Sequence, residues 1–205
     1  MSWVVLFYSV FLSFAQADNN DTATVIVTEL GALKVGEDFP SFNGQTSDGG
    51  RLSSRSIIGQ GNVSIVSYAA TWCQPCRYGL PIIERVVHAD DTVQAVYVTL
   101  DKELTKVQRW AMDLQIKSPI VVDRFNAIAK RHGVISEDGK QSREIPITIV
   151  IDGKGIIRQI LTTEGHDFDS RLIEAIDVAK QSSTQFEGPT LQSPDSSNHE
   201  KAGIQ

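Results

Sequence analysis

Two cysteines, Cys73 and Cys76, are the residues with the clearest capacity for chemistry, and the 205-residue chain contains no others. A secreted protein that is stapled by disulfides carries more cysteines, spread along the chain. Two thiols in a Cys-x-x-Cys spacing therefore predict a reactive pair that forms and breaks a single disulfide, rather than a structural framework.

The pair stands where a predicted strand, residues 63–70, gives way to a predicted helix that starts at residue 75. A thiolate at a helix N-terminus is stabilised by unpaired N–H groups and by the positive end of the helix dipole. Because only the thiolate attacks a disulfide, Cys73 is predicted to be the nucleophile. Cys76, one turn further along, is placed to attack the mixed disulfide formed at Cys73.

Two other interpretations of the cysteine pair stay open from the spacing alone. The pair could be half of a zinc site, but none of the four histidines, His88, His132, His166 and His199, has a paired metal-ligand spacing. It could also be a purely structural disulfide, although so short a loop constrains the chain little. We expect no metal and no cofactor.

The elements that must position the pair alternate along the chain. Further strands are predicted over residues 93–100, 120–122, 147–151 and 156–161, and helices over residues 75–89, after Asp101, after Asp123 and over residues 169–180. Asp101 and Asp123 are predicted N-caps, and Phe125 is placed in the second of these helices. Glycine-containing turns are predicted at residues 47–50 and 152–155. This order predicts an α/β fold with a mixed central sheet and helices on both faces.

Both ends of the chain differ in composition from the middle. An apolar run over residues 3–14, followed by Ala15-Gln16-Ala17, predicts a signal peptide over residues 1–17 and a periplasmic or secreted protein. No Lys or Arg precedes the run, so a retained N-terminal helix or membrane anchor is an alternative. We predict a tether, or a first strand, over 18–33, a domain over 34–181 and a disordered polar tail over 182–205.

Charge limits the partners that this chain can have. The net charge is −6 and the basic residues are scattered, which gives no support to a nucleic-acid surface. We expect a monomer whose partners are proteins with thiols or disulfides, together with an upstream redox partner.

Three motifs together resemble the thioredoxin superfamily: Trp72-Cys73-x-Pro75-Cys76 after a strand, Ile145-Pro146 before a later strand, and Asp152-Gly153-x-Gly155 in the hairpin that follows. Residues 35–40 are similar to the N-terminal extension of the TlpA/ResA-like branch. The resemblance spans residues 34–180. It implies a thioredoxin-like fold with an N-terminal β-extension and the activity of an extracytoplasmic thiol–disulfide oxidoreductase.

The resemblance also implies roles for individual residues. Cys73 and Cys76 correspond to the attacking and resolving cysteines. Trp72, Ile145 and Pro146 correspond to substrate-binding positions, and Pro146 matches a cis-proline that lies across from the cysteines. The alternatives are an ordinary trans proline at a strand edge and a tryptophan that belongs to the core or the general surface.

Departures from the family pattern concern proton transfer and the loop before Pro146. Ser67 and Gly79 stand where relatives carry an acid, and Glu84 is predicted to lie on an exposed helix face. The loop over residues 134–146 is longer than the compact pattern. Its Arg143 and Glu144 could contact substrate or belong to a solvated loop.

The resemblance favours a disulfide reductase over two alternatives. Reduction of apocytochrome c cysteines or of a metallochaperone fits the branch. A peroxiredoxin-like peroxidase would need a threonine three residues before its cysteine, whereas Thr71 stands two before Cys73. A copper-binding module of the same fold would have a wider cysteine spacing and a defined histidine.

Overall fold

Five strands form one mixed sheet at the centre of the molecule. The computed structural model describes residues 27–136, 145–162 and 166–184. The strand order is β7-β6-β5-β8-β9, with β5 at Val63–Ala69, β6 at Val93–Thr99, β7 at Ile120–Val122, β8 at Ile147–Ile151 and β9 at Ile157–Leu161. β6 is parallel to β5 and β7, whereas β8 is antiparallel to β5 and β9. The carboxyl ends of β5, β6 and β7 therefore meet the amino end of β8 at one edge of the sheet, the cysteine edge, where Cys73 follows β5.

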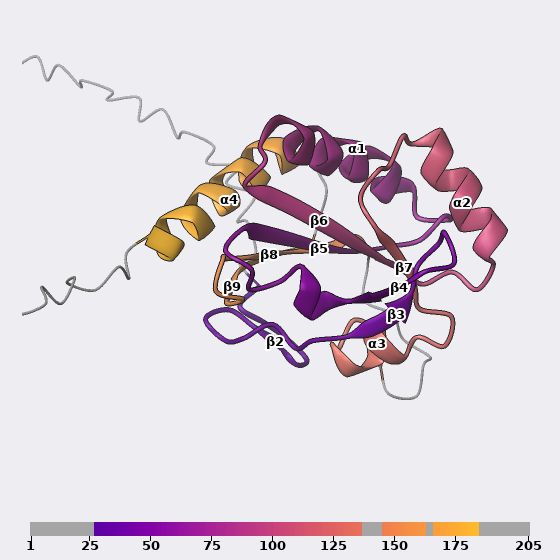
Figure 1. Ribbon diagram of the computed structural model, residues 1–205, viewed down its shortest axis with the longest axis horizontal. Coiled ribbons are helices and arrows are strands. Elements are labelled where there is room, and N and C mark those ends of the chain that lie inside the picture. Colours follow the sequence, from indigo (N-terminus) through magenta and orange to yellow (C-terminus); the bar gives the residue numbers. More distant parts are fainter. Residues whose placement is uncertain (1–26, 137–144, 163–165, 185–205) are drawn as a thin grey trace, which may run out of the picture.

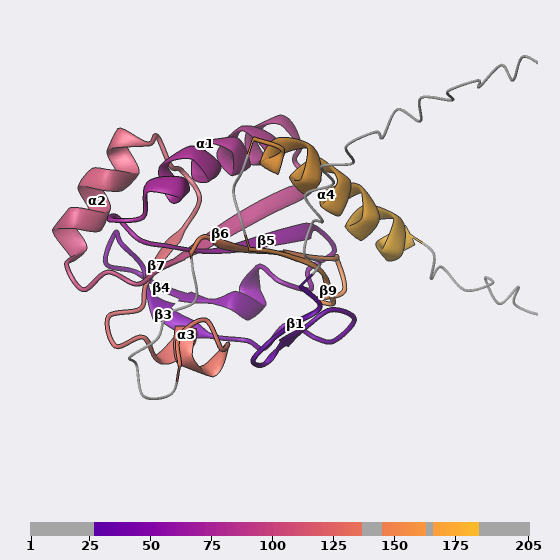
Figure 2. The same cartoon turned by 180° about the vertical axis from the view of Figure 1, so that it is seen from behind.

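Helices cover both faces of this sheet, as predicted. The helices are α1 (Gln74–Ala89), α2 (Leu104–Asp113), α3 (Ala127–Arg131) and α4 (Phe168–Thr184). Figures 1 and 2 show α1, α2 and α4 on one face, and α3 with the short strands β3 (Asn43–Gln45) and β4 (Arg51–Ser53) on the other. Successive right-handed crossovers from β5 to β6 to β7 place α1 and α2 on the same face. No helix in the described part of the chain has the length and apolar character needed to cross a bilayer.

Burial on both faces explains the composition of the central strands. All of β5 and β8 is buried, and both strands are rich in β-branched residues, which pack well on a pleated surface. The predicted hairpin turns are also present. Gly49, between β3 and β4, and Gly155, between β8 and β9, have φ angles of 91° and 93°, which glycine adopts at little cost.

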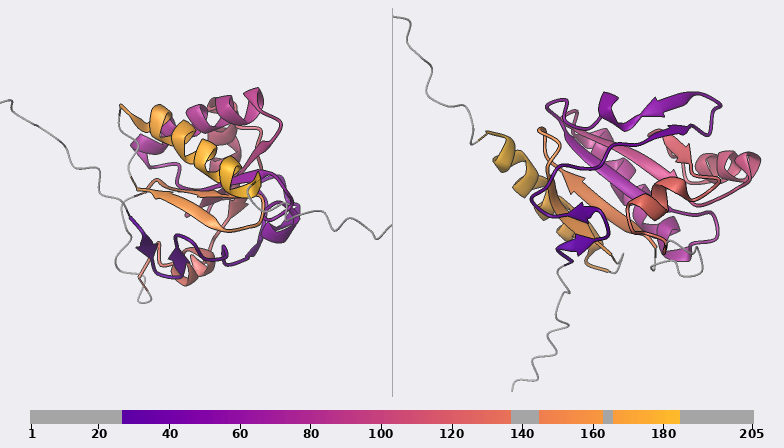
Figure 3. Two further views of the ribbon diagram at one scale, coloured as in Figure 1. Left: turned by 90° about the vertical axis from the view of Figure 1, so that its left-hand side faces the viewer. Right: turned by 90° about the horizontal axis from the view of Figure 1, so that it is seen from below.

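The domain begins earlier than predicted. β1 (Glu29–Leu30) and β2 (Leu33–Lys34) form an antiparallel pair, and Val27 bridges to Ile160 of β9. Leu30 and Leu33 are fully buried, so this segment is anchored to the core, in agreement with the alternative of a first strand and not with a tether. Figure 3 shows this pair on the side of the sheet opposite α4. At the other end, α4 extends to Thr184, past the predicted boundary at residue 181. The predicted signal peptide and most of the predicted tail lie outside the described residues.

An aromatic cluster joins the N-terminal segment to the face of the sheet that α3 covers. The His132 ring makes edge-on contacts with Phe39, Phe42 and Tyr68, and its Nδ1 shares a hydrogen bond with the Tyr68 hydroxyl. All four side chains are buried. His132 is therefore a core residue, which removes one ligand from the zinc interpretation.

The starts of α2 and α3 differ from the predicted caps. Glu103, not Asp101, precedes α2, and Asn126, not Asp123, precedes α3. Both aspartates lie a few residues earlier, at the cysteine edge. The Asp123 carboxylate still accepts a hydrogen bond from the Ala129 N–H in the first turn of α3, whereas the Asp101 carboxylate accepts hydrogen bonds from Thr71 instead. Phe125 lies before α3 instead of within it, and it is 87% exposed.

Candidate active site

The cysteine pair occupies the turn between β5 and α1. The Cys73 N–H donates to the Ala70 carbonyl at 3.0 Å, which closes the turn. Cys73 is the N-cap of α1, and its Sγ accepts a hydrogen bond from the Cys76 N–H at 3.2 Å. Pro75 lies in the first turn of the helix, where the loss of an N–H costs no intrahelical bond. The predicted placement of Cys73 at a helix N-terminus is thus confirmed.

Cys73 and Cys76 are joined by a disulfide, with their Cα atoms 5.4 Å apart. Cys73 is 4% exposed, whereas Cys76 is 0% exposed. An incoming sulfur can therefore approach only Cys73 without local opening, and Cys76 lies behind it. This asymmetry matches the predicted division into an attacking and a resolving cysteine.

The dipeptide before β8 faces the pair across the sheet edge. The Ile145–Pro146 bond is cis, as predicted. The Ile145 carbonyl oxygen lies 3.5 Å from Cys73 Sγ. In the disulfide, Cys73 Sγ carries no proton and cannot donate a hydrogen bond to this oxygen. In the reduced protein, the Cys73 thiol could donate to the same oxygen. Ile145 and Pro146 are both buried, and they form the wall of the site opposite Cys73.

The third predicted substrate-binding residue, Trp72, points into solvent. Its side chain is 64% exposed, which excludes the core interpretation. A tryptophan that stands in water beside a reactive sulfur is available for contact with another molecule. Arg143 and Glu144, which could contact substrate or belong to a solvated loop, lie outside the described residues.

Asp101, which its position before a helical pattern predicts to be an N-cap, belongs instead to the site. Its carboxylate accepts hydrogen bonds from the Thr71 N–H at 2.9 Å and from the Thr71 hydroxyl at 2.6 Å. Asp101 is 6% exposed and follows β6, so these bonds connect the ends of two neighbouring strands. The position of Asp101 directly after a predicted strand is the sequence signal for this contact, because the carboxyl ends of adjacent parallel strands meet at the same edge.

Neither position where relatives carry an acid holds one here. The Ser67 hydroxyl shares a hydrogen bond of 2.9 Å with the Thr148 hydroxyl, both buried within the sheet, and Gly79 is buried in α1. Tyr68, the next residue along β5, contacts His132 on the face covered by α3. Ser67 therefore faces the opposite side, toward α1, because successive residues of a strand alternate between faces.

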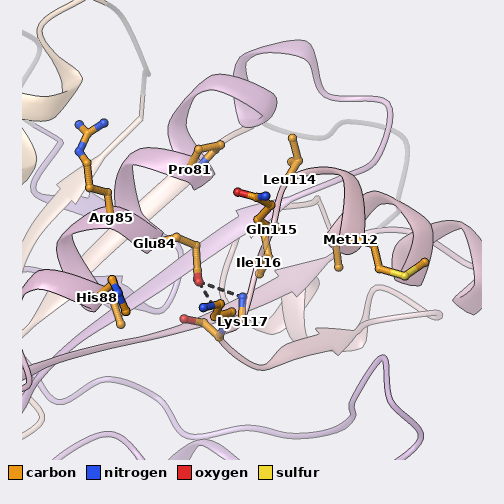
Figure 4. A pocket seen from close by; sticks show the side chains of 12 residues that line it. Pro81, Glu84, Arg85, His88, Met112, Leu114, Gln115, Ile116 and Lys117 are labelled. Atoms are coloured by element: carbon orange, nitrogen blue, oxygen red, sulfur yellow. Dashed lines mark hydrogen bonds between the residues drawn. The ribbon is translucent and has the colours of Figure 1, made fainter.

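Glu84 is not on an exposed face, contrary to the prediction. Its carboxylate accepts hydrogen bonds from the Tyr97 hydroxyl at 2.8 Å and from the N–H groups of Lys117 and Ser118 at 2.9 Å and 3.4 Å. Figure 4 shows Glu84 in a surface groove between α1 and the segment after α2. Glu84 is more than two helical turns beyond Cys76, so it ties α1 to this segment and is not part of the cysteine site.

Comparison with known proteins places this architecture in a family. Residues 35–160, more than half of the chain, match the AhpC/TSA family. The chain belongs to the AhpC/TSA family. Within the relatives, it is 26% identical to the thioredoxin-like protein YneN of Bacillus subtilis, over 62% of this chain and 71% of YneN. It is 25% identical to the thiol-disulfide oxidoreductase ResA of Geobacillus thermodenitrificans, over 66% of this chain and 73% of ResA.

Solved structures agree with this assignment. A thiol:disulfide interchange protein of the thioredoxin family from Chlorobium tepidum has a TM-score of 0.55 and 28% identity, with 71% of this chain and 97% of that chain covered. The thioredoxin-like fold and the class of thiol–disulfide oxidoreductase, both predicted from the sequence, are thereby confirmed. Trp72, Cys73, Cys76, Ile145 and Pro146 lie together at the cysteine edge, and their roles in the reaction are a proposal.

Proposed function

We propose that this protein is an extracytoplasmic protein-disulfide reductase that works through Cys73 and Cys76. One observation carries the proposal: Cys73 is the accessible sulfur, at the N-terminus of α1 and opposite Ile145, while Cys76 is buried behind it. A structural disulfide needs no such asymmetry. The helix N-terminus favours the Cys73 thiolate, which is the attacking species.

The reaction is two successive exchanges between sulfurs. The Cys73 thiolate attacks one sulfur of a substrate disulfide, a mixed disulfide forms, and the second substrate sulfur leaves as a thiolate that takes up a proton. The Cys76 thiolate then attacks Cys73 Sγ, which frees the first substrate thiol and closes the Cys73–Cys76 disulfide. Two electrons and two protons pass to the substrate, and a dithiol donor must restore them.

Trp72, Ile145 and Pro146 are proposed to bind the substrate around its reacting cysteine. Ile145 and Pro146 form one wall beside Cys73, where the Ile145 backbone offers hydrogen-bonding groups to an extended peptide. The exposed Trp72 ring contributes apolar contact on the other side. We propose that the enzyme acts as a monomer, with protein disulfides as substrates and a second thiol protein as the donor.

The assignment as a reductant rests on the resemblance of Gln74-Pro75 and Ile145 to reducing members of the superfamily. Location outside the cytoplasm rests on the apolar run and the Ala15-Gln16-Ala17 pattern. N-terminal sequencing of the natural protein tests the location. A mature chain that begins at Asp18 supports cleavage and export, and an intact soluble chain contradicts it.

Reduction of insulin by dithiothreitol tests the activity itself. The wild-type protein should accelerate precipitation of the insulin B chain, and Cys73→Ser should abolish the acceleration. Consumption of hydrogen peroxide in the presence of dithiothreitol should stay at the background rate. Peroxide turnover that depends on Cys73, without insulin reduction, would instead assign the pair to a peroxidase.

A further inference from the structure

A tight turn after β7 presents an unusual side chain at the cysteine edge. The Asn126 N–H donates to the Asp123 carbonyl at 2.9 Å, and the Asp123 carboxylate accepts from the Ala129 N–H at 2.8 Å. Asn126 has a φ of 56°, a left-handed conformation that asparagine tolerates. Phe125 occupies the middle of this turn, and its side chain is 87% exposed.

Two hydrogen bonds to Asp123, one to its carbonyl and one to its carboxylate, hold the turn that carries Phe125. A phenyl ring in water forgoes the free energy that burial would supply. Single exposed apolar residues are common and need no explanation. Phe125 differs because a second large aromatic residue, Trp72, is 64% exposed at the same edge.

Backbone hydrogen bonds place the two aromatic residues at one level. The Leu100 N–H donates to the Ala69 carbonyl at 3.0 Å, and the Asp123 N–H donates to the Thr99 carbonyl at 2.9 Å. The chain therefore leaves β5, β6 and β7 at the same height. Neighbouring strands are about 4.8 Å apart, so the turn after β7 is about 10 Å from the turn that carries Cys73.

Cations surround these aromatic residues, although the chain as a whole carries a net charge of −6. Arg124 is in the same turn, Lys102 follows β6, and Arg77 is in the first turns of α1; all three are exposed. In the part of the chain that the structure describes, none of the three forms an ion pair with an acidic side chain. Of the carboxylates next in sequence to Lys102 and Arg124, Asp101 and Asp123 are buried and accept hydrogen bonds. Glu103 is exposed and forms an ion pair with Lys106.

We propose that Phe125, Arg124 and Lys102 extend the substrate site across the sheet edge and bind an acidic segment of the substrate protein. Pro146 precedes β8, on one side of β5, and Phe125 follows β7, on the other side of β5. A peptide that is held at Pro146 while its cysteine reacts with Cys73 therefore continues across the end of β6 toward Phe125. An extended peptide advances about 3.3 Å per residue. Phe125 therefore selects a large apolar side chain about three residues from the reacting cysteine. This inference rests on the proposed function.

Peptides with one cysteine capped by thionitrobenzoate test the inference. Attack by the reduced protein and closure of its own disulfide release the peptide thiol and the coloured thionitrobenzoate, so the rate is read directly. A parent peptide carries glutamates around the cysteine and leucine at the third position on both sides. Two matched peptides replace the leucines with serine or the glutamates with lysine.

The wild-type protein should react with the parent peptide at least fivefold faster than with either matched peptide. Phe125→Ser should lower the parent rate to that of the serine peptide and leave the serine-peptide rate within twofold of wild type. Phe125→Leu should restore most of the preference, and Arg124→Gln should weaken the preference for glutamate over lysine. Met112→Ser is the matched control, because Met112 is 72% exposed on α2 and lines the groove that contains Glu84.

Equal rates for the three peptides with the wild-type protein would overturn the inference while leaving the proposed reductase intact. If the peptide rates are equal and the wild-type protein forms a dimer that Phe125→Ser dissociates, the inference is also overturned, because the surface would then bind a second copy of the chain. Failure to release thionitrobenzoate from any peptide would overturn the proposed function and this inference together.

Discussion

The Asp101 carboxylate accepts two hydrogen bonds from Thr71, one from the backbone N–H at 2.9 Å and one from the hydroxyl at 2.6 Å. The turn that carries Cys73 is thereby attached to the end of β6 as well as to β5. Thr71 is two residues before Cys73. Because the Asp101 carboxylate is bonded to Thr71, it also places a negative charge near the Cys73 thiolate. Asp101 is thus expected to fix the position of Cys73 and to moderate its ionisation.

Asp101→Asn should make Cys73 more reactive and the fold less stable. Removal of a nearby negative charge favours the thiolate, so alkylation of the reduced protein by iodoacetamide at pH 6 should be about threefold faster. Loss of the charged acceptor should lower the free energy of unfolding by about 1.5–3 kcal/mol. Both quantities are measured on the same preparation, with Cys76→Ser as the background so that only Cys73 reacts.

Asp123→Asn is the matched control for this prediction. Asp123 is also buried at the end of a strand and accepts a backbone N–H, but it is one strand further from Cys73. It should lose comparable stability without any change in alkylation rate. Equal acceleration in both variants would show that loosening of the edge, and not the charge of Asp101, controls Cys73.

Stability should fall in mild acid because of His132. Burial lowers the pKa of His132 from 6.5 to about 4, and the Arg131 charge acts in the same direction, while a backbone hydrogen bond with Pro40 opposes them. Above pH 6.5 the histidine is neutral in both states and contributes no pH dependence. Between pH 6.5 and 4 the unfolded chain binds a proton that the native state does not, so the free energy of unfolding drops by about 3 kcal/mol in total.

Urea denaturation of the wild type and His132→Gln between pH 7 and pH 4 checks this dependence. Glutamine keeps a hydrogen-bonding group near Tyr68 but does not titrate. The difference in the free energy of unfolding between the wild type and His132→Gln isolates His132, because the contributions of other titrating groups cancel in it. This difference should shift against the wild type as the pH falls. His166→Gln, at an exposed position, should show no such change. A constant difference between wild type and His132→Gln would contradict the buried neutral histidine.

Glu84 should stabilise the fold without affecting chemistry. Glu84→Ala removes the acceptor for the Tyr97 hydroxyl and for the N–H groups of Lys117 and Ser118. We expect the free energy of unfolding to fall by about 1–3 kcal/mol. Glu174→Ala, at an exposed position of α4, should change it by less than about 0.5 kcal/mol. Insulin reduction that falls while stability is unchanged would assign Glu84 a role in the reaction.

Most of the fold follows from local patterns in the sequence. The buried central strands and the glycine turns at Gly49 and Gly155 have signals that depend on a few neighbouring residues. The part of the fold that the sequence did not predict depends on distant contacts. Leu30 and Leu33 lie in a stretch that mixes apolar and polar residues, and only the position of that stretch against β9 explains their burial.

The sequence predicts the cysteine and proline motifs of the site better than the residues around them. Cys73 and Pro146 belong to recognisable motifs, whereas the Asp101–Thr71 bonds depend on the pairing of β5 with β6. The sequence predicts Asp101 to be a helix cap because an aspartate before a helical pattern usually is one. Helical spacing predicts Phe125 to lie in a helix, because this spacing does not reveal the left-handed conformation of Asn126. That conformation makes Asn126 the residue before α3, and Phe125 therefore lies outside the helix.

Trapping of a substrate tests the central claim, which is that Cys73 attacks and Cys76 resolves. A Cys76→Ser variant can still form the mixed disulfide but cannot break it. Incubation of this variant with a disulfide-containing protein such as insulin, followed by non-reducing electrophoresis, measures the complex. The matched Cys73→Ser variant retains Cys76, which is fully buried, and is treated identically.

The account predicts that Cys76→Ser accumulates a mixed disulfide, with Cys73 identified at the linkage by mass spectrometry, and that Cys73→Ser accumulates at least tenfold less. Equal trapping by the two variants, or linkage chiefly through Cys76, would contradict the assignment of roles and with it the proposed mechanism.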